Sequence, residues 1–442
     1  MRYSLSVTAR LPRAASTLAL ALALASGCNK PTSDSIQLWK TTQKGPERLH
    51  DALADHGVAP KLRAEAAAAM IDIGRAEEVD TVIQALPADD RAEIAKTFQP
   101  MCELAMKDPS PDKALAYRDA LYSLRQFVPP DEQKRIDAAL VPALEADLKV
   151  GHLRQGRHSV DKMLTAIGPD AAAMLARVLA EPEAVYPQAA DLLGKIGDPD
   201  AREKGGVALV ARAKDKGRAP KGKTKEPEGA IYKALGAVGG PTAVKYLEEK
   251  VTGSDKEDAA FAVRALQERR DPAVLPFALK VAGDPRADKV IRDEMFGVVE
   301  KIGGLDAQKG LLEIISSDKE ELVRYRAFES ALVAGKNEAI GPALEAFPAS
   351  ASYKRVDVDD LLVKLIEKMN PSPRPALEKV LASAAPLARM TAVLSLEQVG
   401  KAADAPALEK LAGDTSSVKG FPAGDTIGKE AARVAEALKK KP

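Results

Sequence analysis

Few residues of this 442-residue chain have the types and spacing that chemistry requires. Residues 217–224 (GRAPKGKT) match the G-x-x-x-x-G-K-[ST] pattern of a phosphate-binding loop. Such a loop leaves a buried strand and opens a helix whose N-terminus meets the phosphates. Here a charged helical segment precedes the pattern, and Pro227 and Gly229 would break the helix that should follow it. We therefore expect no nucleotide site.

Residue patterns for metals and for hydrolysis are equally poor. The histidines form two pairs, His50 with His56 and His152 with His158, and a six-residue spacing places the two rings on different faces of a helix. Neither H-E-x-x-H nor G-x-S-x-G occurs. The acidic run at 357–360 (DVDD) has no glycine at the sixth position of a calcium loop. We expect no catalytic residues, no metal and no cofactor.

The segment before Cys28 has the order of charged, apolar and small residues that is typical of an export signal. Residues 18–25 form an apolar run that is far shorter than the about 20 residues of a membrane-spanning helix. The basic residues ahead of this run are Arg2, Arg10 and Arg13, and residues 25–27 after it are small.

Residues 24–28 (LASGC) resemble the lipobox of bacterial lipoproteins. The resemblance implies that residues 1–27 are a signal peptide and that Cys28 carries acyl chains, which would anchor the chain to a membrane. Asn29 stands where an aspartate favours inner-membrane retention in such lipoproteins, so the expected location is the cell envelope, at the outer membrane and facing the periplasm. The alternative is an ordinary secretory signal with a coincidental cysteine.

Composition favours an all-α protein. The chain is 45% hydrophobic but only 4% aromatic, and alanine and leucine form helices well. Its 65 basic and 64 acidic residues nearly balance, so no nucleic-acid partner is expected. With Cys28 acylated, Cys102 has no disulfide partner and is either a buried apolar group or a reactive thiol.

One short pattern recurs along the chain: a helix that ends at glycine. Examples are AMIDIG at 69–74, MLTAIG at 163–168, LLGKIG at 192–197, ALGAVG at 234–239, VVEKIG at 298–303 and SLEQVG at 395–400. Arg270, Gly335 and Asn370 hold the same place in weaker copies, and the usual spacing is about 30 residues. A second amphipathic segment follows each copy. Such helix pairs bury their apolar faces only by stacking, which predicts an α-solenoid.

The one long interval, between Gly197 and Gly239, contains a basic insertion at 214–228. We expect an exposed loop there, which is either simply solvated or in contact with acidic lipid headgroups or an acidic partner. It has no aromatic residue on which bases could stack. Its cations are Lys214, Lys216, Arg218, Lys221, Lys223 and Lys225.

An arginine stands eleven residues before the closing position in several first helices: Arg63, Arg157, Arg292, Arg324 and Arg389. With contexts such as LRAEAAAAM and VRYRAFESAL, the repeats resemble the HEAT family, in particular the HEAT-like repeats of phycobilisome lyases. The resemblance covers residues 61–440 and is weak at 77–156. It implies a curved superhelix that serves as a binding surface. We expect these repeat-junction arginines to bind carbonyls or carboxylates, the alternative being a ladder that contacts a ligand.

Residues 28–60 complete the predicted organisation as a tether and an N-terminal cap. Leu38 and Trp39 there either cover the open end of the first repeat or contact the membrane interface. The expected function is a membrane-anchored scaffold whose second helices bind an unidentified protein of the cell envelope. The alternative is a lyase-like enzyme or a tetrapyrrole-handling protein, for which the candidate groups are Tyr186, Tyr232 and Tyr325.

Overall fold

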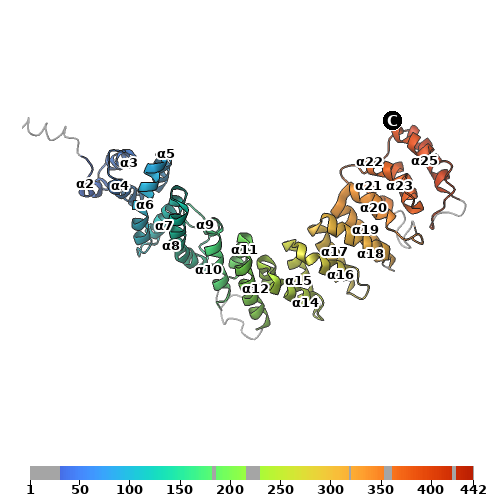
Figure 1. Ribbon diagram of the computed structural model, residues 1–442, viewed down its shortest axis with the longest axis horizontal. Coiled ribbons are helices and arrows are strands. Elements are labelled where there is room, and N and C mark those ends of the chain that lie inside the picture. Colours follow the sequence, from blue (N-terminus) through green and yellow to red (C-terminus); the bar gives the residue numbers. More distant parts are fainter. Residues whose placement is uncertain are drawn as a thin grey trace, which may run out of the picture. The chain divides into compact units, whose positions relative to one another are not determined.

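The computed structural model describes residues 30–181, 186–215, 229–317, 320–352, 361–420 and 425–441. These ranges contain helices and turns and no strand, which confirms the all-α prediction (Figure 1). The chain divides into unit 1 (Met1–Ala171) and unit 2 (Ala172–Pro442). The division falls within α10 (Pro169–Leu179).

Unit 1 is built of helix pairs in two layers. First helices α2, α4, α6 and α8 pack in succession, and second helices α3, α5 and α7 do the same beside them. The bounds are α2 (Ser33–Trp39), α3 (Gly45–Ala54), α4 (Pro60–Asp72), α5 (Ala76–Ala85), α6 (Ala88–Ala105), α7 (Pro111–Leu124), η1 (Arg125–Phe127), α8 (Pro130–Lys149) and α9 (Val160–Ile167). The weakly matching region at 77–156 therefore continues the stack, with helices of 18, 14 and 20 residues after α5.

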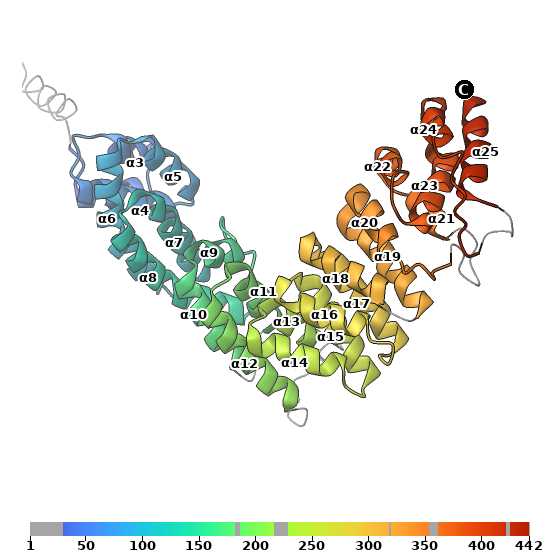
Figure 2. The ribbon, with the colours of Figure 1, turned by 45° about the vertical axis from the view of Figure 1, so that its right-hand side comes forward.

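Unit 2 repeats the same plan with shorter helices. Its first helices are α11 (Tyr186–Ile196), α13 (Ala230–Val238), α15 (Lys256–Arg269), α17 (Lys289–Ile302), α19 (Glu321–Gly335), α21 (Leu361–Glu367), α23 (Pro386–Val399) and α25 (Ile427–Lys439), each in contact with the next. Its second helices are α10, α12 (Pro199–Lys214), α14 (Pro241–Val251), α16 (Leu275–Ala282), α18 (Gly304–Ser317), α20 (Ile340–Glu345), α22 (Arg374–Val380) and α24 (Ala405–Glu409). Figure 2 shows these pairs, and the stacking confirms the predicted α-solenoid.

The residues that close the first helices behave as predicted at most positions. Left-handed backbone, with φ between 55° and 81°, occurs at Gly74, Gly168, Gly197, Gly239, Arg270 and Gly303. The prediction is wrong at Gly335, where φ is −115° and the following residue, Lys336, takes φ 51° instead. It is also wrong at Gly400, which is extended with φ −75° just before η4 (Ala402–Asp404), and at Asn370, which does not have a positive φ.

The core consists of the apolar faces predicted from the helical periodicity. In α13, for example, Ala234, Leu235 and Val238 are at most 1% exposed, and they follow the helical spacing. Cys102 is buried in α6 and its burial raises the pKa of the thiol well above its usual range, so it packs as a small apolar group.

Candidate functional site

Several predicted site residues lie outside the described residues. These are Cys28, the acidic run 357–360, and five cations of the basic insertion: Lys216, Arg218, Lys221, Lys223 and Lys225. The sixth, Lys214, is the last residue of α12, and its Nζ lies 5.8 Å from the ring centroid of Tyr246 on α14. Lys214, where the basic insertion begins, thus lies next to α14.

Three of the repeat-junction arginines bond a first helix to the start of the next first helix or to the segment before it. Arg63 donates from Nε to the carbonyl of Leu53 at 2.8 Å and from Nη1 to Asp90, in the first turn of α6, at 3.0 Å. Arg292 on α17 donates to Glu320, the N-cap residue of α19, at 3.1 Å. Each arginine therefore ends on a carboxylate at the start of the following pair.

Arg389 makes the fullest junction of this kind. From α23 its Nε donates to Asp414 at 2.8 Å and its Nη1 to the carbonyl of Ser383 at 2.7 Å. The side chains of Arg63, Arg292 and Arg389 are only 4%, 7% and 13% exposed. Arginines that are buried and already bonded to the chain cannot also form a surface ladder for a ligand.

The other two arginines behave differently. Arg157 precedes α9 and donates from Nη1 to the carbonyl of Ala76 at 3.2 Å and to the carboxylate of Asp80, both on α5. It therefore bonds an earlier pair instead of the next one. Arg324 is half-buried in α19, and its side chain interacts with another part of the protein.

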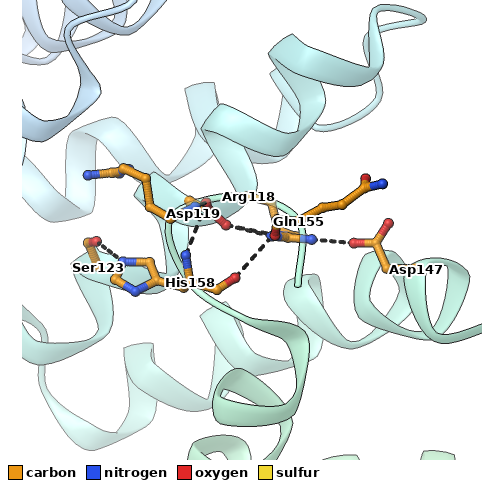
Figure 3. A network of polar contacts seen from close by, with 7 residues as sticks. Arg118, Asp119, Ser123, Asp147, Gln155 and His158 are labelled. Carbon is orange, nitrogen blue, oxygen red and sulfur yellow. Dashed lines mark hydrogen bonds and ion pairs between the residues drawn. The ribbon is translucent and has the colours of Figure 1, made fainter. Parts of the chain in front are cut away.

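Unit 1 contains a buried polar network that the sequence patterns did not reveal (Figure 3). Arg118 and Asp119 on α7 are 2% and 1% exposed, and Arg118 Nη2 donates to Asp119 at 2.7 Å. Arg118 also donates to Asp147 on α8 and to the carbonyl of Gln155 at 2.9 Å. The network attaches the segment 150–159 to α7 and α8. The sequence signal that could have revealed this network is an arginine next to an aspartate on the apolar side of a helix (YRDAL).

The same network includes a serine and a histidine at hydrogen-bond distance. Ser123 Oγ donates to Asp80 Oδ2 at 3.0 Å and lies 3.1 Å from Nε2 of His158. In a hydrolase the carboxylate orients the imidazole, which takes the proton of the serine. Here Asp80 accepts the serine proton directly and also binds Arg157, so the hydroxyl is not activated toward His158. The arrangement is structural.

The tyrosines considered for an enzyme are core residues. Tyr186, Tyr232 and Tyr325 are 2%, 5% and 3% exposed. Tyr325 donates to the carbonyl of Ser352 at 2.8 Å, and the ring of Tyr232 stacks on Phe261 at 5.9 Å. Burial raises the pKa of Tyr232 far above its usual range, and hydrogen bonding to Asp258 adds to this. All three side chains therefore belong to the interior of the repeats.

The apolar residues of α2 divide between core and solvent. Ile36 is fully buried against the next helices, whereas Leu38 is 62% exposed. Leu38 therefore does not cover the end of the stack, because it lies on the opposite face of α2 from Ile36. Trp39 is half-buried, with the guanidinium of Arg48 at 5.9 Å from its ring.

Neither a metal centre nor a membrane span is present in the part of the chain that the structure describes. It holds no group of three or more His, Cys, Asp or Glu side chains arranged to bind a metal. Among the same residues, every helix is too short or too polar to cross a bilayer.

The surface of unit 2 carries grooves where neighbouring pairs meet. A groove of about 640 Å³ lies where the α14–α15 pair meets the α16–α17 pair, and we call it the α14–α16 groove. A second, of about 490 Å³, separates α20 from α22. A third, of about 370 Å³, lies between α19 and α21. These hollows are the places where a partner could insert side chains.

A short motif recurs in three second helices, two of which border one of these grooves. Pro-Ala-Leu-Glu occurs at 342–345, 375–378 and 406–409, in α20, α22 and α24. In each copy the leucine is buried and the proline is exposed, so equivalent edges of three helices face solvent. The recurrence was visible in the sequence and would have located this surface.

No protein-family model matches the chain, and no curated protein is significantly similar to it. Solved structures of the karyopherin Kap121p are similar at low identity. The complex with the SUMO protease Ulp1p is 13% identical with a TM-score of 0.35, and the complex with Pho4p is 14% identical with a TM-score of 0.35. Both alignments cover 96% of this chain and 47% of the karyopherin, so the chain spans about half the length of that protein. The fold assignment depends on the helix packing described above.

Proposed function

We propose that this protein is a lipid-anchored, extracytoplasmic scaffold that binds another protein of the cell envelope through the second-helix side of its repeats. The observation that supports the proposal most is how its polar clusters are used. The junction arginines and the Arg118 network bond segments of the chain to one another, while grooves and second-helix edges remain open. Open repeat surfaces with internally bonded polar groups are typical of binding proteins.

The anchor follows from the lipobox resemblance at Cys28 and from the short distance to the first helix. Thr32 caps α2, and its hydroxyl accepts from the backbone N–H of Ser35 at 3.2 Å. Ser33, where α2 begins, is five residues beyond Cys28, and these residues span at most about 18 Å when extended. An acylated Cys28 would hold the first helix pair close to the membrane surface.

Palmitate labelling tests the anchor. Wild-type chain expressed in a bacterium with lipoprotein processing should incorporate labelled palmitate, and the Cys28→Ala chain should not. Cys102→Ala is the matched control and should be labelled like the wild type, because Cys102 is buried. Equal labelling of all three chains, or of none, would contradict the lipid anchor.

Site-specific photocrosslinking tests the scaffold. A photoreactive residue is placed at Lys379 on α22, a second helix, or at Lys301 on α17, a first helix; both side chains are exposed. The proposal expects a crosslinked envelope protein from position 379 and none from position 301. Equal crosslinking from both positions, or none from either, would count against a binding face on the second helices.

A further inference from the structure

The α14–α16 groove exists because two consecutive second helices remain apart. Helix α12 lies close to α14, where Gly206 leaves room only for the side chain of Ala243: an added Cβ would be 3.2 Å from it. By contrast, α14 and α16 make little contact with each other: α14 packs on α12, α13 and α15, and α16 packs mainly on α17. The loops 252–255 and 283–288 form the two banks of the space that remains.

The floor of this groove is apolar. It is formed by side chains from all four helices: Val251, Ala259, Phe277, Val281 and Ile291. Phe277 is only half-buried, and the neighbouring Val290 on α17 is 65% exposed. The volume of about 640 Å³ lies within the range of about 300–1,000 Å³ that is usual for binding pockets. The groove can therefore remove large apolar side chains from water.

The rim carries three cations and two carboxylates. Lys256 pairs with Asp288 at 3.0 Å, and Arg286 pairs with Asp284 at 3.1 Å. These cations hold the pKa values of Asp288 and Asp284 below the usual range, so both carboxylates stay ionised at neutral pH. Lys280 on α16 is exposed, and its positive charge also contributes to lowering the pKa of Asp284. The side chains that line the groove thus carry one more positive than negative charge.

The placement of these cations favours an extended ligand. Lys256 stands on one bank and Arg286 on the other, with side chains 84% and 88% exposed, and Lys280 on α16 also lines the groove. Side chains this exposed move at little cost toward new partners. Because the groove is open to solvent, it would not enclose most of a small molecule's surface, as small-molecule sites do.

We propose that the α14–α16 groove binds a short segment of a partner protein that inserts apolar side chains between α14 and α16 and carries acidic residues beside them. The acidic residues would meet Lys280 and the mobile Lys256 and Arg286. This inference depends on the proposed scaffold function and names the chemistry of the contact.

Fluorescence anisotropy with defined peptides tests the groove on the purified full chain. Three fluorescein-labelled peptides share a central Leu-Phe-Leu and carry glutamates, glutamines or lysines on both sides. We expect the glutamate peptide to bind about tenfold more tightly than the lysine peptide at about 0.1 M salt. At about 1 M salt, where the Debye length falls to about 3 Å, that preference should largely disappear. Equal affinity for the three peptides, or no binding, would overturn the proposal.

A matched pair of variants locates the binding. Lys280→Glu should reverse the preference between the acidic and basic peptides. Lys309→Glu makes the same charge change at an exposed position of the next second helix, α18, and should leave both affinities unchanged. Circular dichroism verifies that both variants fold. If Lys280→Glu has no effect, or if Lys309→Glu has the same effect, the groove is not the site.

The peptide result and the photocrosslinking result are independent. If an envelope protein crosslinks at position 379 while no peptide discriminates by charge, the groove proposal fails and the scaffold stands. If the acidic peptide binds as expected while no crosslinked partner appears, the scaffold proposal fails instead.

Discussion

Units 1 and 2 stack helix pairs in the same way but connect them differently. In unit 1 the connection near α7 and α8 is a buried ionic network, in which Arg118 and Asp119 are almost inaccessible to water. In unit 2 the connections include cross-pair ion pairs at the margin, such as Arg433 with Glu397 at 2.6 Å, whose side chains are 49% and 27% exposed, and close backbone approaches at glycine. One repeat plan therefore tolerates two kinds of junction, and these differ in how much stability is lost when a junction residue is substituted.

The loss of stability differs because the two kinds of junction are desolvated to different extents. A buried charge that loses its partner cannot regain water, so truncation of one member costs several kcal/mol. A partly exposed pair that is broken recovers solvation and costs far less. A glycine contact has no charge at stake but leaves no room for a side chain. Four substitutions test these three cases and one further case, a buried hydroxyl without a partner. They are given from the largest expected effect to the smallest.

Arg118→Leu should have the largest effect. It leaves Asp119 buried without its partner and releases the carbonyls of the segment 150–159, so we expect the free energy of unfolding of unit 1 to fall by about 3–5 kcal/mol. Urea denaturation measures the loss, and hydrogen exchange should rise in residues 150–159. Arg135→Leu, at a side chain 70% exposed on α8, should cost less than about 0.5 kcal/mol. Similar losses in both variants would remove the distinction between buried and exposed pairs.

Gly194→Ala tests the close approach of α11 and α13 in unit 2. Alanine usually stabilises a helix by about 0.5–1 kcal/mol relative to glycine, but here the added Cβ would lie 2.1 Å from the carbonyl oxygen of Ala237. Because backbone must shift, we expect a net loss of about 1–3 kcal/mol in thermal or urea unfolding. Gly413→Ala, where nothing lies within 4 Å, is the control and should be near neutral. A stabilised Gly194→Ala protein would contradict the tight contact.

Thr391→Val should stabilise unit 2. The hydroxyl of Thr391 on α23 is fully buried and has no hydrogen-bond partner among the described residues. Valine has the same shape without the unsatisfied group, so we expect a gain of about 1 kcal/mol in urea unfolding. Thr81→Val in unit 1 serves for comparison because Thr81 is exposed, and it should change stability by less than about 0.5 kcal/mol. A loss of stability in Thr391→Val would show that this hydroxyl is satisfied.

The smallest effect concerns pH. The hydrogen bond from Arg433 holds the pKa of Glu397 below its usual range, so the carboxylate stabilises the folded state above its unfolded pKa of about 4.3. This contribution is lost as the pH falls through the lower, folded-state value. Glu397→Gln should therefore cost under about 1 kcal/mol at pH 7 and nothing in strong acid.

A double-mutant cycle sharpens this last prediction. Arg433→Gln should cause a somewhat larger loss at pH 7, because it also removes the ion pair with Glu430, and the double variant should lose less than the sum of the two single losses. Unfolding in urea at neutral and acidic pH measures the loss of stability in each variant and its dependence on pH. Fully additive losses would mean that the two residues do not stabilise each other.

Local sequence patterns predicted much of the fold because they depend on neighbouring residues. Glycine after an apolar helical run predicted the left-handed closures at Gly168, Gly197, Gly239 and Gly303. The same rule was wrong at Gly335, because the neighbouring Lys336 adopts the left-handed conformation. Which of two adjacent residues takes that conformation is decided by how the next helix packs, which no local pattern contains.

The long-range contacts were harder to predict. The position of Arg63, Arg292 and Arg389 before each closure predicted arginines bonded to carbonyls or carboxylates. Which carboxylates these are, 25 to 28 residues further on, is decided only when the pairs stack. The Arg118 network joins α7, α8 and a loop, and no repeat pattern marks it. The α14–α16 groove likewise results from a difference in spacing between second helices.

By itself the sequence determined the helical class, the repeat period, the residues of the core and the pattern at Cys28. Each of these depends on spacing within about 30 residues, where side-chain periodicity and backbone preference decide. The tertiary structure alone decided which arginines meet which carboxylates, which polar clusters are consumed by the fold and where the surface stays open. These depend on distances between segments far apart in the chain, which are set when apolar faces pack together and exclude water.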